Sequence, residues 1–198
     1  LFRSCLPFFA QELELFSIIP QGMLIDSKNP IRYSFINMLD NNPSTVYAVE
    51  NKSIDRTKPF LVFVFASDAN VDTIKMKHGY FDNRYFFTND RLKEIVVTKK
   101  YRSKIVFQKK FILTDEMNEQ ELKLGNEKCD EIYIDLKDIY VGKNWDDVVI
   151  SDISFYYDSK KIDCNYSKNG KFLVSDFVHK LKYDSNSLLE EERFQYGK

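Results

Sequence analysis

The loop from His78 to Phe87 contains the side chains that sugar recognition requires, in the order His-Gly-Tyr-Phe-Asp-Asn-Arg-Tyr-Phe-Phe. Tyr80 supplies a flat ring for the C–H face of a sugar. His78, Asn83 and Arg84 supply hydrogen-bond donors and acceptors for its hydroxyl groups. Two of these residues have a structural alternative, because a single histidine is more often structural or exposed and Tyr80 could be a packing residue. As a group, they predict a glycan-binding site on this loop.

Three residues outside that loop are further candidates for sugar contact: Asn89, Arg91 and Trp145. Asn89 and Arg91 could donate to sugar hydroxyls, but a structural role is favoured for both. In that role Asn89 caps the preceding loop, and Arg91 pairs with a carboxylate, Asp146 or Asp147. Trp145 is the only tryptophan and follows a glycine turn, so its ring is either a sugar platform or a plug for the end of the fold. The packing role is favoured for Trp145 as well.

Catalytic machinery is not visible in the sequence. Asp146 and Asp147 suggest an acid/base pair, but adjacent residues on a strand point to opposite faces and cannot face one another. The chain contains two histidines and has no Gly-x-Ser-x-Gly, His-Glu-x-x-His, phosphate-loop or dinucleotide motif. We therefore predict a binding module and not an enzyme.

Three motifs occur in an order that resembles a known family. They are Leu39-Asp-Asn-Asn-Pro-Ser-Thr45, Asn89-Asp-Arg-Leu-Lys93 and the stretch from Tyr140 to Phe155, which contains Gly-Lys-Asn-Trp-Asp-Asp and Ile-Ser-Asp-Ile. Together they resemble the NADase-type glycan-binding domains, a discoidin-like family, over about residues 31–160. The resemblance implies an all-β, galactose-binding-like jelly-roll β-sandwich whose usual work is binding.

The same resemblance implies a structural calcium ion. Many galactose-binding-like domains wrap calcium with a Leu-Asp-Gly-Asp-x-x-Thr loop, whose matching residues here are Asp40, Asn42 and Thr45, and an acidic residue late in the sheet, here Asp152. Calcium prefers six to eight oxygen ligands, and the loop has lost one carboxylate to an asparagine, which weakens such a site. The alternative is a capped Asx turn that holds no metal.

Period-two alternation of apolar and polar residues predicts strands along most of the chain. The segment 59–66 is continuously apolar, which favours a strand buried on both faces. The high aromatic content, 17 Phe and 12 Tyr, suits a β-rich fold because aromatic rings pack well on a pleated surface. The predicted strands, which together indicate a single β-sandwich domain over 12–183, are 59–66, 71–77, 92–98, 104–113, 131–137 and 148–155.

The C-terminal part follows a different pattern. Asn169-Gly170 predicts a hairpin turn. Beyond it, Ser187-Leu-Leu-Glu190 has the spacing of a capping box and predicts a short helix from Leu188 to Phe194. We therefore expect residues 184–198 to form a helical tail outside the sandwich.

Composition and charge limit the partners. The 198 residues contain 29 Lys and Arg and 30 Asp and Glu, a net charge of −1, so the basic excess of a nucleic-acid binder is missing. No apolar run reaches the ~20 residues of a transmembrane helix. We therefore expect neither a nucleic-acid partner nor a membrane-spanning segment.

Residues 1–10 resemble the end of a bacterial secretory signal cleaved after Ala10, which predicts an exported protein, periplasmic, surface-bound or secreted. Arg3 and Phe8 do not suit such a signal, and the alternative is an ordinary segment of a domain cut from a larger protein. Without this leader, Cys129 and Cys164 remain as either a disulfide or two free thiols. Two cysteines and two histidines without close spacing do not make a zinc site.

We expect a carbohydrate-binding module of an exported bacterial protein, which recognises a glycan through loops at one end of a β-sandwich. The alternative is a protein–protein interaction or adhesion module on the same scaffold. A glycan site exposes an aromatic ring beside arginine, histidine or amide groups in a concavity, whereas a protein-binding face shows a broad apolar patch.

Overall fold

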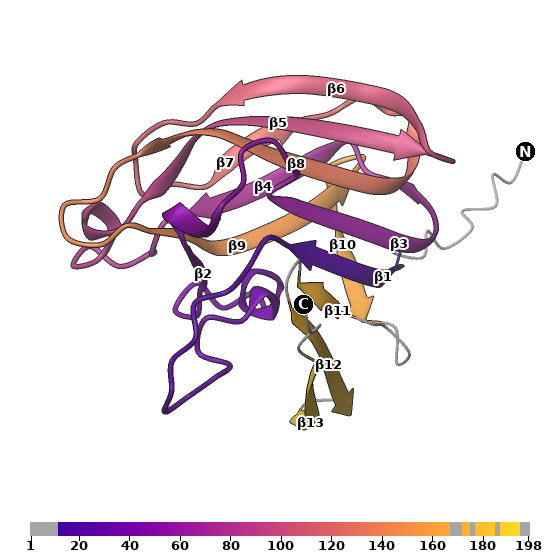
Figure 1. Cartoon of the computed structure of the whole chain (residues 1–198). Helices are drawn as coiled ribbons and strands as arrows, with labels where there is room; N and C mark the ends of the chain where they lie inside the picture. Colours follow the sequence, from indigo (N-terminus) through magenta and orange to yellow (C-terminus); the bar gives the residue numbers. More distant parts are fainter. Residues whose placement is uncertain (1–11, 167–171, 175–176, 185–186, 195–198) are drawn as a thin grey trace, which may run out of the picture.

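The chain forms a β-sandwich of two mainly antiparallel sheets (Figure 1). The computed structural model describes residues 12–166, 172–174, 177–184 and 187–194. All neighbours in the first sheet are antiparallel pairs. In spatial order its strands are β6 (Lys104–Ile112), β5 (Arg91–Tyr101), β8 (Lys128–Tyr140), β3 (Leu61–Asn70) and β1 (Glu12–Pro20).

The second sheet is built around a central strand, β9 (Asp147–Tyr157). One edge of β9 pairs with β4, and the other pairs with β2 in its first half and β10 in its second half. β10 joins the two sheets, because it continues past β9 to pair in parallel with β1. The partner strands are β2 (Tyr47–Glu50), β4 (Thr73–His78), β7 (Gln120–Lys123), which pairs with β4, and β10 (Lys160–Tyr166).

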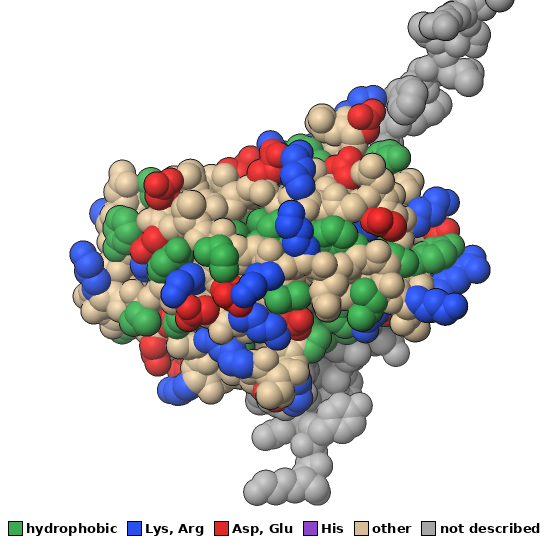
Figure 2. Space-filling view, turned by 90° about the horizontal axis from the view of Figure 1, so that it is seen from above, with side chains coloured by type: hydrophobic (Ala, Val, Ile, Leu, Met, Phe, Trp, Pro, Cys, Tyr) green, Lys and Arg blue, Asp and Glu red, His purple; other side chains and the backbone are tan. Residues whose placement is uncertain are grey.

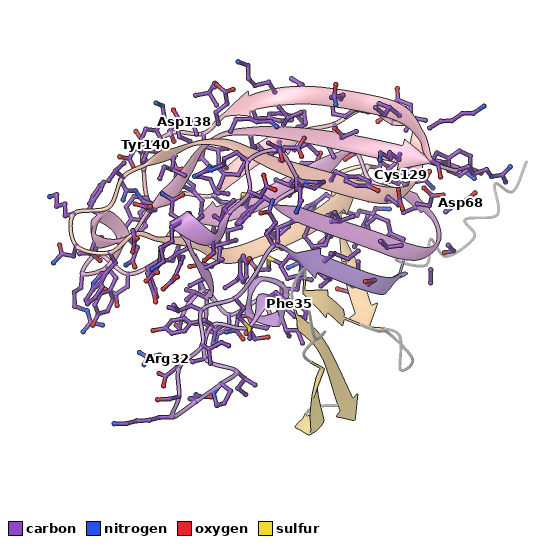
Figure 3. All side chains as sticks on the ribbon, viewed as in Figure 1. Arg32, Phe35, Asp68, Cys129, Asp138 and Tyr140 are labelled. Atoms are coloured by element: carbon purple, nitrogen blue, oxygen red, sulfur yellow. The ribbon has the colours of Figure 1, made fainter. Side chains whose placement is uncertain are left out.

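Three short 3-10 helices lie in the connections: η1 (Phe35–Leu39), η2 (Asn51–Ser53) and η3 (Phe86–Thr88). The segment between β1 and β2, which contains η1, lies below the sheets in the view of Figure 3. Arg32 lies on its outer part, and Phe35 lies nearer the sheets. Phe35 is buried in the main hydrophobic core. Met38 of the same helix is also in this core, so η1 anchors the long connection to the sheets.

The core between the sheets is rich in aromatic rings. Phe63 and Phe65 of β3 meet Phe155 of β9 edge to face, with ring centroids 5.2 and 5.8 Å apart. Full burial of one such side chain contributes about 1.5–3 kcal/mol. The six strands predicted from alternation are confirmed as β3, β4, β5, β6, β8 and β9, and with them the predicted β-sandwich.

Strand β9 differs from its prediction in burial. Alternation predicts one face in water, yet every residue from 148 to 155 is buried. One reason is a β-bulge: Ile150 pairs with His78 and Asp152 pairs with Lys77, so Ser151 is an extra residue. A bulge exchanges the faces that the following side chains occupy.

The segment before β2 also covers the outer face of β9. Val149 packs there with Val46 and Ala48, and Tyr33 and Tyr80 pack against this small cluster. Because β9 is covered on both faces, its exposure to water does not alternate along the strand as it would in a strand with one exposed face. The same cover places Tyr33 and Tyr80 close to the surface, where they border the pocket described below.

A buried lysine ties two connections to the first sheet. The ammonium group of Lys99 donates to the carbonyl oxygens of Val71 and Gly125, at 2.8 and 2.7 Å. Burial lowers the pKa of Lys99. Without these two bonds a buried ammonium group would be strongly unfavourable, so they fix both connections against the sheet.

The outer face of the first sheet carries ion pairs. Lys110 pairs with Glu94 at 3.3 Å, and Lys137 lies 3.9 Å from Asp135. Figure 2, which views the molecule from above β6 and β5, shows Lys and Arg side chains interspersed with Asp and Glu. Across the described residues, no helix is both long and apolar enough to cross a membrane.

Cys129 and Cys164 are both free thiols, the second of the two alternatives left by the sequence. They lie on β8 and β10, respectively. Burial raises the pKa of the Cys129 thiol to about 11 and that of Cys164 to about 12. Neither thiol is a reactive thiolate at neutral pH.

The C-terminal residues form a separate three-stranded sheet of β11 (Phe172–Val174), β12 (Phe177–Asp184) and β13 (Ser187–Phe194). The helix predicted over Leu188 to Phe194 is therefore a strand in the structure. β13 pairs antiparallel with β12 over its whole length, so its backbone groups bond across strands and not along a helix. The predicted turn at 169–170 and the leader at 1–10 lie outside the described residues.

At the end of the sandwich that carries Asp138 and Tyr140 (Figure 3), two loops pack tightly together. The amide of Gly142 donates to Oδ1 of the buried Asp90 at 2.7 Å, and the amide of Trp145 donates to the carbonyl of Thr88 at 2.9 Å. A Cβ atom on Gly142 would lie 2.5 Å from the carbonyl carbon of Asn89 and 2.6 Å from the oxygen of Thr88. This backbone-to-backbone approach requires glycine.

We expect Gly142→Ala to lower the free energy of unfolding by about 2 kcal/mol, because backbone atoms must move to admit the methyl group. Urea denaturation measures the change. Gly22→Ala is the matched control, since its Cβ would meet only a methyl group of Val49 at 3.3 Å, and we expect a change below about 1 kcal/mol there. Equal effects of the two substitutions would contradict the close-approach account.

Candidate functional site

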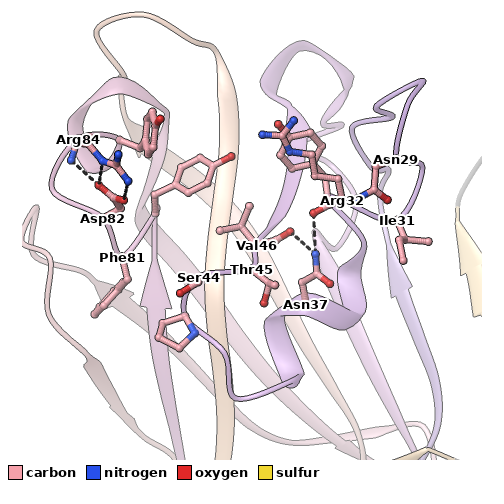
Figure 4. A pocket seen from close by; sticks show the side chains of 14 residues that line it. Asn29, Ile31, Arg32, Asn37, Ser44, Thr45, Val46, Phe81, Asp82 and Arg84 are labelled. Carbon is pink, nitrogen blue, oxygen red and sulfur yellow. Dashed lines mark hydrogen bonds and ion pairs between the residues drawn. The ribbon is translucent and has the colours of Figure 1, made fainter. Parts of the chain in front are cut away.

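A pocket of about 580 Å³ lies between the β1–β2 connection and the loop that follows β4 (Figure 4). Its two walls come from segments that are separated in the sequence by β2, β3 and β4 and are brought together by the packing of both on β9. The first wall consists of Asn29, Ile31, Arg32, Tyr33, Asn37, Pro43, Ser44, Thr45 and Val46. The second consists of Tyr80, Phe81, Asp82, Arg84 and Tyr85.

The second wall presents an oriented guanidinium group. Oδ1 of Asp82 accepts from the amide and Nε of Arg84, at 2.8 and 3.0 Å, and Oδ2 accepts from Nη2 at 2.7 Å. These hydrogen bonds lower the pKa of Asp82 to about 2. The guanidinium lies 5.2 Å from the ring centroid of Tyr85. The pair is exposed and adds little stability, but it holds Arg84 in one orientation with donors left for a ligand.

The first wall repeats this arrangement. Nη1 of Arg32 donates to Oδ2 of Asp26 at 2.9 Å, and the guanidinium lies 5.2 Å from the ring centroid of Tyr33. Oδ1 of Asp26 accepts from the amides of Lys28 and Asn29, at 2.8 and 3.3 Å. Each wall therefore carries an arginine held by a nearby aspartate and lying over the tyrosine that follows it in sequence.

Tyr80 lies between the two arginine–tyrosine pairs. Its ring is 5.7 Å from that of Tyr85, and its other side packs on the cluster that covers β9. Burial raises the pKa of Tyr80, and the neighbouring Tyr33 raises this pKa further. The phenol is therefore protonated at neutral pH and can act as a hydrogen-bond donor. Tyr80 therefore packs on the cluster that covers β9 and also lines the pocket, so its position agrees with both alternatives predicted for it.

The loop site predicted from the sequence is only partly assembled. Tyr80 and Arg84 line the pocket, whereas Asn83 is exposed on the same loop and is not among the lining residues. His78 lies in the interior, where no ligand reaches it. Its Nε2 is 3.0 Å from the carbonyl oxygen of Thr114, and its ring meets Phe86 edge to face. His78 has the structural role that the sequence left as its alternative.

Arg91 and Asn89 have structural positions. Arg91 is buried and binds the carboxylate of Asp115 through Nε and Nη2, at 2.7 and 3.1 Å, so its partner is neither Asp146 nor Asp147. Its Nη1 donates to the carbonyl oxygens of Phe86 and Asn89, at 3.3 and 2.5 Å. The side-chain amide of Asn89 donates to the carbonyl of Tyr85 at 3.3 Å, which caps the loop as predicted.

Trp145 lies outside the pocket. Its side chain is 62% exposed, so the ring does not plug the end of the sandwich, which was the favoured prediction. The tight packing of the loop that carries it is achieved by backbone groups and by Gly142, and this leaves the indole free of the interior.

Sequence reasoning missed the first wall of the pocket. Arg32, Tyr33 and Asn37 lie in a part of the chain where no sugar-contacting residue was predicted from the sequence. The side-chain amide of Asn37 donates to the carbonyl oxygens of Arg32 and Val46, both at 2.9 Å, and so ties the two parts of this wall together (Figure 4). A usable signal was present: the dipeptide Arg-Tyr occurs at 32–33 and again at 84–85.

The residues predicted to hold calcium fall into two groups. Oδ1 of Asp40 accepts from the amide of Asn42 at 2.8 Å, and Oδ2 accepts from the hydroxyl of Thr45 at 2.6 Å. Asp152 is buried on β9, 3.7 Å from the ammonium group of Lys77. Among the described residues, no three His, Cys, Asp or Glu side chains are placed to share a metal ion.

The bonds in this loop therefore match the metal-free Asx turn. The ammonium group of Lys161 also contacts Oδ1 of Asn41, which puts a positive charge beside the loop. One carboxylate whose oxygens already accept two hydrogen bonds is a weak donor set for calcium. The predicted calcium site remains a prediction that metal titration can test.

The groups that line the pocket favour binding over chemistry. They offer rings for stacking, guanidinium, amide and hydroxyl donors, and the carboxylate of Asp82 as an acceptor. The pKa of Asp82 is far below neutrality, and the pKa values of Arg84 and Tyr80 are raised. None of these three groups exchanges a proton near neutral pH, as a general acid or base must.

Comparison with known families and structures gave clear matches. The family model described as NAD glycohydrolase translocation F5/8 type C domain matches residues 17–156. Comparison with curated protein sequences gave no match. A pectin-binding carbohydrate-binding module has a similar structure, with 9% sequence identity and a TM-score of 0.51 over 78% of this chain and 98% of the module.

Two larger proteins contain similar domains. The structure of the two CBM32 modules and the M60 catalytic domain of Clostridium perfringens ZmpB matches with 16% identity and a TM-score of 0.52, over 74% of this chain and 14% of that chain. The mycobacterial arabinofuranosyltransferase AftD matches with 8% identity and a TM-score of 0.53, over 77% of this chain and 12% of that chain. At these identities the likeness concerns the fold, and it confirms the discoidin-like β-sandwich.

His78 predicts a dependence of stability on pH. Burial lowers its pKa from the usual 6.5 to about 4, so the unfolded chain binds the proton more readily. Its contribution is complete above pH 6.5 and is lost as the pH falls to about 4, at a cost of up to about 3 kcal/mol. We expect a histidine NMR titration near pH 4. His78→Gln should flatten the fall in unfolding free energy over this interval, and an equally steep fall would contradict the assignment.

For the Asp40 loop, we expect excess calcium chloride, compared with EDTA, to change the melting temperature by less than about 1 °C, because binding to the folded state would raise it. Differential scanning calorimetry measures the shift. Asp40→Asn is the control, since it removes the charge and keeps an acceptor oxygen. A rise of several degrees in calcium that Asp40→Asn abolishes would show that the loop binds the ion.

Proposed function

The chain belongs to the family of NAD glycohydrolase translocation F5/8 type C domains, and from this premise we propose that it is a non-catalytic carbohydrate-binding module. The family resemblance inferred from the sequence is confirmed by this match. The observation that supports the proposal most is the pocket between the β1–β2 connection and the loop after β4, with an arginine–tyrosine pair on each wall.

The chemistry of the pocket suits a sugar. Tyrosine rings pack against C–H faces, and an arginine beside an aspartate can donate to one hydroxyl while the carboxylate accepts from its neighbour. Arg84 and Asp82 have this relation to each other. Because their mutual bonds fix them before the ligand arrives, little conformational entropy is lost on binding. The pocket is open to solvent and is lined by exposed side chains such as Arg84 and Tyr85, so we expect weak affinity for a single sugar.

We extend the proposal to the setting of the module. The parent protein is exported from a bacterium, and the module attaches it to a glycan or glycosylated surface. The pectin-binding module of similar fold makes pectin fragments a sensible member of any test panel. Because the pocket groups do not exchange protons near neutral pH, they support attachment and not turnover.

The test is a glycan array that contains both neutral and acidic sugars, probed with the protein displayed in several copies so that weak sites are detected. We expect specific binding, and we expect Arg84→Ala to weaken it at least tenfold, since the variant removes hydrogen bonds from a charged donor.

Lys109→Ala, on the exposed strand β6, is the matched control and should bind as the wild type does. Melting curves of all three proteins show whether each is folded. If the folded wild-type protein binds no glycan of the array, the proposal is contradicted, and a protein partner becomes the alternative to test. Unchanged binding by Arg84→Ala would move the site away from this pocket.

A further inference from the structure

The indole of Trp145 is exposed on a loop whose backbone is firmly held. The amides of Lys143, Asn144 and Trp145 donate to the carbonyl oxygens of Phe87 and Thr88, at 2.9–3.0 Å. A large apolar ring gains stability from burial, so one that is 62% exposed on a fixed loop has no packing role that accounts for its position. A rigid exposed ring is well suited to binding, because little freedom is lost when a ligand stacks on it.

Two further exposed rings lie on the segment that joins the pocket to the strand end where the loop of Trp145 is bonded. Phe87 is 46% exposed and precedes Thr88, whose carbonyl accepts from the amide of Trp145 at 2.9 Å. Tyr85 is also 46% exposed and lines the pocket, two residues before Phe87. A 3-10 helix rises about 2 Å per residue, so Tyr85 and Thr88 are about 6 Å apart along η3. The loop of Trp145 therefore meets the same short helix that borders the pocket.

We propose that the binding surface continues from the pocket past Tyr85 and Phe87 to Trp145, and that the ligand is an oligosaccharide chain and not a single terminal sugar. This inference rests on the proposed function. In this arrangement the pocket binds one residue of the chain, and Trp145 stacks on another residue further along it.

Polar groups between the rings favour a sugar chain over a protein segment. The ammonium group of Lys143 lies 5.9 Å from the ring centroid of Phe87, and the guanidinium of Arg84 lies 5.2 Å from that of Tyr85. A sugar chain offers C–H faces and hydroxyl groups in alternation, which suits rings separated by cations. A protein anchor would instead require a continuous apolar patch.

The test compares ligand lengths. Isothermal titration uses two ladders from monosaccharide to hexasaccharide, one of acidic oligogalacturonides and one of neutral galactan fragments. We expect the hexasaccharide of at least one ladder to bind at least tenfold more tightly than its monosaccharide. Trp145→Ala should remove that gain and leave the affinity of the monosaccharide unchanged, whereas Arg84→Ala should weaken both.

Tyr157→Ala is the matched control, because Tyr157 is an exposed aromatic residue at the far end of β9. The single tryptophan gives an independent measurement, since emission excited at wavelengths too long for the tyrosines to absorb comes from Trp145. We expect long ligands to change this emission and monosaccharides to leave it unchanged.

Equal affinities for short and long ligands, or a Trp145→Ala variant that keeps the length dependence, would overturn the inference while the pocket remains a sugar site. Loss of monosaccharide binding in a folded Trp145→Ala protein would overturn it as well. If the wild-type protein binds neither the two ladders nor any glycan of the array, the proposed function itself fails, and this inference fails with it.

Discussion

The buried guanidinium group of Arg91 is the interaction on which the binding end of the molecule depends. It holds the carboxylate of Asp115 and the carbonyl oxygens of Phe86 and Asn89, so one side chain fixes both ends of η3. Arg91 is 3% exposed and Asp115 is 33% exposed, so loss of these acceptors would leave the positive charge of Arg91 buried without compensation. The loop that carries Tyr80, Arg84 and Tyr85 therefore has a fixed base, although its tip is exposed.

The pocket follows from a second constraint, the cover over β9. Because the segment before β2 packs on the outer face of that strand, its Arg32 and Tyr33 come to face the loop after β4. Two local motifs then work in the same way, each with an aspartate that orients an arginine over a tyrosine. Preorganised donors and rings on opposite walls are the physical basis for assigning recognition to this pocket.

The sequence predicted β3, β4, β5, β6, β8 and β9 because the hydrophobic pattern of a strand is a local signal, and the bulged β9 was found even though its burial was misjudged. The shorter β2 and β7 and the first strand, β1, were not predicted. Of the pocket residues, it singled out Tyr80 and Arg84 for sugar contact, since residues of the second wall are close together in the chain. The first wall depends on tertiary packing that no local pattern encodes. The structural role of His78 and the exposure of Trp145 are likewise set by neighbours distant in sequence. The C-terminal capping box predicted a helix where cross-strand pairing gives β13.

The most direct test of the central claim is an NMR titration of the protein labelled with nitrogen-15. The ligands are galactose, N-acetylgalactosamine, oligogalacturonides and galactan fragments at millimolar concentration, which detects weak sites. The account predicts that at least one of them shifts the backbone amide signals of Tyr33, Thr45, Tyr80 and Arg84 on both walls of the pocket. Shifts confined to the opposite end, near Asp68 and Cys129, or no shift with any ligand, would contradict it.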